Sequence, residues 1–278
     1  MRILVTGASG QLGTTVVTDY AGRADVVPVT RTALDLGDAA AVEAFVARER
    51  PDVVVNCAAF TDVDGAEDRA MEAIRVNALA VRALARGAAA AGAAFVHYGT
   101  DFVFDGLSDR PYSEDDEPAP QSVYACSKLM GDWFAADCPS HYVLRVESLF
   151  GGSQRRSSVD KIADAIRQGQ PARVFVDRTV TPSYVRDVAD ATWRLLETGA
   201  APGVYHCVNS GMTTWFELAK EIGTLLGVEP ELVPVKVADV PMRARRPQYA
   251  ALTNDKLVRA GIGMPTWQDA LGRYLATL

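Results

Sequence analysis

The stretch "RILVTGASGQLG", residues 2–13, decides the fold class of this 278-residue chain. Its apolar residues predict a buried strand over 2–7. Glycines follow at positions 7, 10 and 13, where a helix is expected to begin. Glycine lets the backbone approach a pyrophosphate, whose charge the helix N-terminus stabilises. A tight turn without a ligand is the alternative, but the strand before and the helix after favour a dinucleotide site formed by Gly7, Gly10, Gln11, Leu12 and Gly13.

The first half of the chain repeats this order of strand and helix. Short apolar runs predict further strands at residues 25–30, 52–59, 93–99 and 142–148. The stretches between them carry apolar residues three and four positions apart, which predicts helices. Strands linked by helices form a parallel sheet that is covered on both faces. We therefore expect an α/β, doubly wound Rossmann-type fold, with ligands bound at the carboxyl ends of the strands.

Beyond residue 150 the alternation becomes less regular. Residues 172–184 predict a pair of strands, residues 185–199 a helix, and residues 203–209 a strand. A further helix is expected at 213–227, capped by Thr213 or Thr214. We expect residues 1–150 plus about 184–208 to form the dinucleotide-binding domain. A smaller C-terminal substrate-binding cap would comprise about 151–183 plus 209–278.

The composition excludes several classes of protein. A hydrophobic content of 49% with 23% charged residues is typical of globular proteins. The net charge of −7 provides no field that would attract nucleic acid. The 4 cysteines form no C-x-x-C pair and have no histidine at metal-ligand spacing, which favours a reducing compartment. No signal peptide or run of about 18 apolar residues is present, so we expect a soluble cytoplasmic protein without a membrane partner.

The end of the second predicted strand bears on the choice between NAD and NADP. An acidic residue about 20 positions after the glycine turn would bind the ribose 2′-hydroxyl of NAD. The chain has Thr30 and Arg31 there instead, and an arginine suits the 2′-phosphate of NADPH. We expect NADPH, with NADH as the alternative cofactor and a solvated surface position as the alternative for Arg31. The other residues expected around the cofactor are Asp35 and Leu36 at the adenine, and Cys57, Ala58, Ala59 and Phe60 after the third strand.

Tyr124 and Lys128 lie four positions apart in "SVYACSKLMG", so on a helix they share a face. A tyrosine with a reference pKa near 10 is a weak acid–base group at neutral pH, and a neighbouring cation lowers that pKa. The spacing alone also occurs on ordinary surface helices. Its position after the fourth strand, downstream of Thr100, favours an acid–base site.

These motifs resemble those of the extended short-chain dehydrogenase/reductases and, within them, the dTDP-4-dehydrorhamnose reductase family. The similarity spans nearly the whole chain and rests on "RILVTGASGQLG", "PDVVVNCAAFTDVDGAE", "VNALAVRALA", "GTDFVFDG", "PYSEDDEPAPQSVYACSKLMGD" and "TPSYVRDVA". It implies NADPH-dependent reduction of the 4-keto group of a nucleotide-linked, dTDP-type 6-deoxyhexose. By this likeness Tyr124 donates the proton, Lys128 holds the nicotinamide ribose and lowers the tyrosine pKa, and Thr100 bonds the carbonyl oxygen.

The same resemblance implies a sugar site with several departures from the family pattern. Asp101 would contact the sugar. The family usually has Ser and Tyr at the positions of Gly99 and Phe102, and a Trp that packs on the sugar at the position of Ser148. Ser148 is therefore expected in the substrate site. Some members bind magnesium through acidic residues, but no matching set is found, so no metal is expected.

The remaining features have less specific interpretations. Arg246, within "MRARRPQ", could bind the substrate's diphosphate, or belong to a plain surface cluster. His97, His141 and His206 are expected to be packed or surface residues, and the four tryptophans to lie in the core. A homodimer is compatible with the sequence.

Two other functions stay open. One is a different nucleotide-sugar enzyme, although a 4,6-dehydratase needs an acid where Phe102 stands and a 3,5-epimerase needs a further acid–base pair. The other is a non-catalytic binding subunit, similar to the regulatory subunit of some methionine adenosyltransferases. The intact Thr100, Tyr124, Lys128 and turn glycines favour the reductase.

Overall fold

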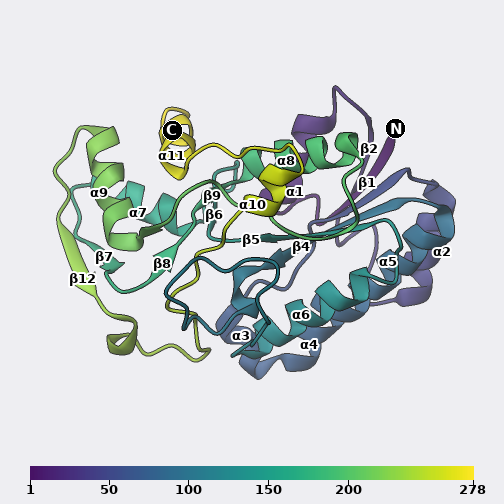
Figure 1. The fold of residues 1–278 in the computed structure, drawn as a ribbon, viewed down its shortest axis with the longest axis horizontal. Coiled ribbons are helices and arrows are strands. Elements are labelled where there is room, and N and C mark those ends of the chain that lie inside the picture. Colours follow the sequence, from purple (N-terminus) through teal and green to yellow (C-terminus); the bar gives the residue numbers. More distant parts are fainter.

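The computed structural model describes residues 1–278 and contains a central sheet of six parallel strands (Figure 1). Their order is β10-β5-β4-β3-β1-β2, and every pairing between neighbours is parallel. The predicted doubly wound Rossmann-type sheet is confirmed. The strands are β1 (Arg2–Thr6), β2 (Asp25–Val29), β3 (Val53–Asn56), β4 (Ala94–Thr100), β5 (His141–Val146) and β10 (Gly203–His206).

Helices cover both faces of this sheet because side chains alternate along each strand. Ile3 and Val5 of β1 pack into one core with α1 (Gln11–Tyr20) and α8 (Val185–Thr198), whereas Leu4 packs into a second core on the other side. The second face carries α2 (Ala39–Glu49), α5 (Ala80–Ala91) and α6 (Val123–Ala135). The segment before α5 consists of α3 (Val63–Asp68), α4 (Ala70–Ile74) and one π-helical turn, η1 (Arg75–Leu79).

The second half of the chain adds three small two-stranded sheets at one end of the molecule (Figure 1). They pair β7 (Ala172–Phe175) with β12 (Leu232–Val235), β8 (Thr179–Val180) with β11 (Thr213–Thr214), and β6 (Leu149–Phe150) with β9 (Ser183–Tyr184). The other helices of this half are α7 (Ser158–Arg167), α9 (Trp215–Leu226), α10 (Asp255–Arg259) and α11 (Trp267–Leu275), of which α10 packs on β10 of the main sheet. The expected pairing within 172–184 is wrong, because each of these short strands finds its partner in a distant segment.

One expectation about the core is also wrong. Trp193, Trp215 and Trp267 are buried, but Trp133 on α6 is 64% exposed. Trp133 follows the buried Asp132 by one position, which turns it about 100° away around the helix. No helix in the structure has both the length and the apolar character needed to cross a membrane.

Candidate active site

The glycine turn connects β1 to α1 and leaves the helix N-terminus open. Gly7 has a φ of +64°, and a Cβ there would lie 2.6 Å from the backbone nitrogen of Ala58. A Cβ at Gly13 would lie 2.1 Å from the Gly7 carbonyl oxygen. No side chain caps α1 at Gly10, so its first N–H groups are available to an anion. The residues therefore fit the pyrophosphate of a dinucleotide.

The residues expected around the adenosine and nicotinamide lie at the carboxyl ends of β2 and β3. Arg31 is exposed and forms no ion pair, whereas the Asp35 carboxylate bonds Arg75 at 3.1 Å. Leu36, Ala58 and Ala59 are half-buried and Phe60 is buried. This arrangement leaves Arg31 as a free cation beside the second strand.

Asn77 fixes the loop that follows β3 and was missed by sequence reasoning. Its Oδ1 accepts from the backbone N–H of Phe60 at 2.8 Å, and its Nδ2 donates to the Phe60 carbonyl and to Ser127 Oγ. Asn77 lies in the π-helical turn, a feature that often marks functional sites. The signal in the sequence was a polar residue inside the apolar run "VNALAV".

Thr100, Tyr124 and Lys128 come together where β4 ends against α6. All three are buried, and the Thr100 hydroxyl, which donates to Asp101 Oδ1 at 3.0 Å, lies close enough to the Tyr124 phenol to lower its pKa. Ser122 caps α6 by accepting from the N–H of Ala125 at 3.2 Å, which aligns the first turn that carries Tyr124. A threonine hydroxyl, a phenol and an amine at one strand end can bind a carbonyl oxygen and transfer a proton to it.

Electrostatics keep the Tyr124 phenol protonated. Burial, together with the negative charge of Asp101, raises the pKa of Tyr124 well above its usual value, and the Thr100 hydroxyl opposes this shift. Lys128 donates to the carbonyl oxygen of Tyr98. Burial lowers the pKa of Lys128 to about 8, and Asp132 opposes that shift. The Tyr124 phenol is therefore protonated at neutral pH. The expectation that Lys128 lowers the Tyr124 pKa is wrong for this structure, because burial and Asp101 raise that pKa while the Lys128 amine is bonded to the Tyr98 carbonyl.

Two buried carboxylates and an arginine flank these residues. Burial raises the pKa of Asp101 to about 6, and its Oδ2 has no hydrogen-bond partner. Glu147 accepts from the backbone and hydroxyl of Thr181, while burial and then Asp101 raise its pKa. Arg178, the cation that lowers the pKa of both acids, was not singled out from the sequence.

Arg178 lies over the Phe102 ring, which in turn contacts Tyr124. Its guanidinium lies 5.7 Å from the centre of the Phe102 ring, which meets the Tyr124 ring edge-on at 5.5 Å. The adjoining Ser148 is half-buried and has a φ of +44°, which is strained for a residue with a Cβ. Backbone strain of this kind clusters at active sites and ligand-binding segments.

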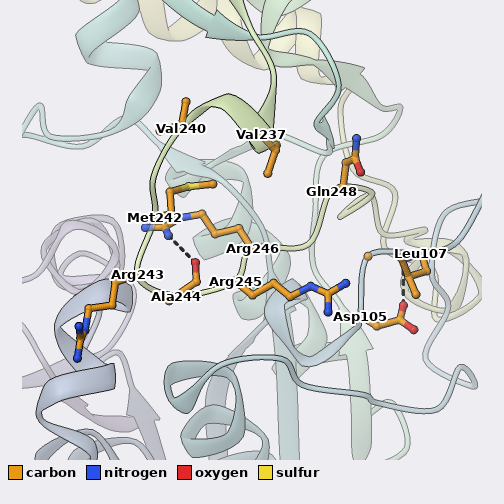
Figure 2. A pocket seen from close by; sticks show the side chains of 11 residues that line it. Asp105, Leu107, Val237, Val240, Met242, Arg243, Ala244, Arg245, Arg246 and Gln248 are labelled. Carbon is orange, nitrogen blue, oxygen red and sulfur yellow. Dashed lines mark hydrogen bonds between the residues drawn. The ribbon is translucent and has the colours of Figure 1, made fainter.

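A cavity of about 380 Å³ lies beyond Arg178, whose Nε donates to the Pro247 carbonyl. Figure 2 shows its three arginines pointing in different directions. Arg246 forms a bidentate pair with Asp64, and Arg243 bonds Asp68, so both charges are balanced. Arg245 extends toward the Asp105 side and bonds only Gln121, at 3.2 Å. The lining residues are Asp105, Gly106, Leu107, Val237, Val240, Met242, Arg243, Ala244, Arg245, Arg246 and Gln248.

Comparison with known proteins identifies the family. A model described as the RmlD substrate binding domain matches residues 1–278. The chain belongs to the RmlD family. The dTDP-4-dehydrorhamnose reductase of Burkholderia thailandensis is 34% identical to this RmlD-family chain, and the alignment covers 98% of this chain and 97% of that protein. The dTDP-4-dehydrorhamnose reductase of Mycobacterium tuberculosis is 37% identical, and the alignment covers 99% of this chain and 92% of that protein. A solved dTDP-4-dehydrorhamnose reductase of Bacillus anthracis in complex with NADP is 30% identical, with a TM-score of 0.95 over 100% of this chain and 99% of that one.

The structure gives a reason for one departure from the RmlD pattern. A Cβ at Gly99 would lie 2.8 Å from Asp132 Oδ1 and 2.9 Å from Arg145 Cγ. Asp132 and Arg145 form a buried ion pair at 3.0 Å. A serine at position 99 would therefore collide with this pair, and glycine leaves the room it needs.

Proposed function

We propose that the chain catalyses NADPH-dependent reduction of the 4-keto group of a dTDP-linked 6-deoxyhexose. The observation that carries this proposal is the meeting of Thr100, Tyr124 and Lys128 at the carboxyl end of β4. That strand end lies on the same edge of the parallel sheet as the glycine turn after β1. The similarity to dTDP-4-dehydrorhamnose reductases over nearly the whole chain supports the substrate class.

In this mechanism NADPH, when bound, supplies the hydride that the carbonyl carbon receives. Thr100 holds the carbonyl oxygen by its hydroxyl, and Tyr124 gives that oxygen its phenolic proton, so that an alcohol forms. The protonated state of buried Tyr124 suits this role. Lys128 is the nearby amine that can offset the phenolate left behind.

The cofactor would lie across the strand ends. Gly7, Gly10 and Gly13 would leave room for the pyrophosphate at the N-terminus of α1, beside Gln11 and Leu12. The exposed, unpaired Arg31 would bind the 2′-phosphate, in keeping with the NADP in the Bacillus anthracis relative. The adenine and nicotinamide would be lined by Asp35, Leu36, Ala58, Ala59 and Phe60.

The sugar would lie between the catalytic residues and the second half of the chain. Asp101 and Ser148 would contact the sugar. Asp101 accepts a hydrogen bond from the Thr100 hydroxyl, and the Ser148 hydroxyl donates to the buried Glu147. The diphosphate would extend into the cavity of Figure 2, beside Arg245 and Arg246. In this arrangement residues 151–183 and 209–278 act as the substrate-binding cap.

The test is cofactor oxidation with a dTDP-4-keto-6-deoxyhexose, comparing the wild type with Tyr124→Phe. Loss of the proton donor should lower kcat by at least about 100-fold, while NADPH binding stays the same. Tyr205→Phe, which removes a phenol bonded only to the Ala201 carbonyl, is the matched control. Absence of substrate-dependent oxidation by the wild type across several such sugars would exclude the reductase.

A cytoplasmic location and a homodimer complete the proposal. All four cysteines are free thiols, which suits a reducing compartment. The exposed Trp133 on α6 and Leu79 at the end of η1 are two of the exposed apolar side chains that a dimer would bury. Light scattering of the wild type and of Trp133→Glu tests this, and identical monomer masses would exclude the dimer.

A further inference from the structure

A buried row of polar side chains runs from the end of β1 to Lys128. The Thr6 hydroxyl donates to Asn56 Oδ1 at 2.7 Å, and the backbone N–H of Ala58 donates to the same oxygen at 3.1 Å. Because a backbone N–H is always a donor, this second bond fixes which end of the Asn56 amide is the oxygen. The Asn56 Nδ2 group therefore donates to His97 Nδ1, 3.1 Å away.

This bond determines the tautomer of His97. Since Nδ1 accepts a hydrogen bond, the proton of the neutral ring must be on Nε2. The ring is neutral because complete burial and, second, the neighbouring Lys128 hold the pKa of His97 well below its usual range. His97 Nε2, which carries this proton, lies 3.4 Å from Lys128 Nζ and 3.9 Å from Asp132 Oδ1.

Asp132 provides the countercharge on the other side of this cluster. Its side chain is 2% exposed, and Oδ2 accepts from Arg145 Nε at 3.0 Å. Its Oδ1 has no hydrogen-bond partner, which is costly for a buried carboxylate. Gly99 leaves this oxygen the space that any larger residue would take. The free oxygen is thus kept beside His97 and within the electrostatic reach of Lys128.

We propose that His97 and Asp132 are positioning residues that together set the charge state of the Lys128 amine in the reduction proposed above. The His97 Nε2–H is complementary to the neutral amine, whose lone pair can accept it, whereas Asp132 stabilises the ammonium. These two groups act in opposite directions on a lysine that burial has already moved to a pKa of about 8. The expected effect on kcat rests on the proposed function, whereas the charge state of Lys128 does not.

The groups that face Lys128 come from three elements. His97 and the Tyr98 carbonyl lie on β4, Asp132 lies on α6, and Arg145 lies on β5 behind Asp132. Arg145 is paired with Asp132, and His97 is neutral. The charge balance at the amine is therefore decided by Asp132 and by the hydrogen bond from His97.

The experiment compares Asp132→Asn, His97→Met and His97→Gln. The pH dependence of NADPH binding is measured by fluorescence without sugar, and that of kcat with the keto-sugar. Asp132→Asn removes the countercharge and should move the basic limb of both profiles down by about 1 pH unit. His97→Met removes the donor to the neutral amine and should move the limb up by about half a unit. His97→Gln keeps an N–H donor near Nε2 and should move the limb much less than His97→Met.

Asp137→Asn, which neutralises an exposed carboxylate just beyond α6, is the matched control and should leave the limb unchanged. Shifts in the same direction for Asp132→Asn and His97→Met, or no shift in either, would overturn the inference. If Asp132→Asn does not fold, the two His97 variants suffice as the test. Basic limbs at the same pH for His97→Met and His97→Gln would then overturn the inference. A wild type that reduces no keto-sugar would refute the proposed function, while the NADPH-binding profiles still test the charge of Lys128.

Discussion

At the scale of single residues, the site combines groups whose pKa values burial has shifted. Tyr124 stays protonated, Lys128 titrates near pH 8, and Asp101 near pH 6. A phenol that remains an acid at neutral pH suits a reaction in which the carbonyl oxygen receives a proton. The protonated Tyr124 is therefore consistent with the carbonyl reduction proposed above.

Arg31 is the residue expected to distinguish NADPH from NADH. Replacing it with alanine removes a charged hydrogen bond to the 2′-phosphate, so the KM for NADPH should rise by about tenfold or more. The KM for NADH should change little, because NADH has no phosphate there. Steady-state kinetics with both cofactors measures this difference, and equal changes in the two KM values would remove Arg31 from the cofactor site.

Arg178 is expected to contribute to sugar binding. Its guanidinium lies against Phe102, close to the two carboxylates of Asp101 and Glu147. Arg178→Gln should raise the KM for the keto-sugar by about tenfold and leave the KM for NADPH unchanged. Arg173→Gln, at an exposed position of β7, is the control. A sugar KM that does not respond would place Arg178 outside the substrate site.

At the scale of elements, the connection from β1 to α1 depends on the absence of side chains. Gly13→Ala would place a Cβ 2.1 Å from the Gly7 carbonyl oxygen, so the turn would have to open. We expect a loss of more than about 2 kcal/mol in the free energy of unfolding, and no measurable NADPH binding.

Gly22→Ala is the matched control for this prediction. No atom lies within 4 Å of a Cβ at Gly22, so the change should stay within about 0.5 kcal/mol. Urea unfolding and NADPH titration measure both variants. Wild-type stability and binding in Gly13→Ala would show that the turn adapts to a side chain.

At the scale of the whole molecule, His206 links stability to pH. It lies at the edge of the main sheet, where burial and then Arg145 lower its pKa to about 3. In the unfolded chain its pKa is about 6.5, so the unfolded state binds more protons between these values. The contribution of the neutral His206 ring to the free energy of unfolding is therefore fully present above about pH 6.5, and it is lost as the pH falls toward 3.

His206→Asn removes this titration and keeps an N–H donor toward the Tyr112 and Thr253 carbonyls. The stability of the variant relative to the wild type should rise by about 3 kcal/mol between pH 7 and pH 4. Comparing the two proteins cancels the opposite contribution of Asp101, whose pKa is raised. Chemical denaturation at several pH values measures the difference, and a constant difference would contradict the linkage.

The sequence by itself determined the doubly wound sheet, the glycine turn and the family. Those features depend on contacts between neighbours in the chain: apolar periodicity sets strands and helices, and a strand followed by Gly7, Gly10 and Gly13 sets the turn. Tyr124 and Lys128 were visible for the same reason, since one helical turn joins them. The catalytic and cofactor roles assigned to these residues stay predictions.

Only the tertiary structure decided which distant side chains meet. The partners of β7, β8 and β9 are β12, β11 and β6, which lie up to 60 positions away, and no local pattern specifies such pairings. The same holds for Arg178 beside Phe102, for Arg246 paired with Asp64, and for His97 between Asn56 and Lys128. His97 looked like an ordinary packed residue because its chain neighbours are apolar. Its tautomer and its charge depend on groups brought to it by β3 and α6, and a hydrogen bond is formed by proximity in space.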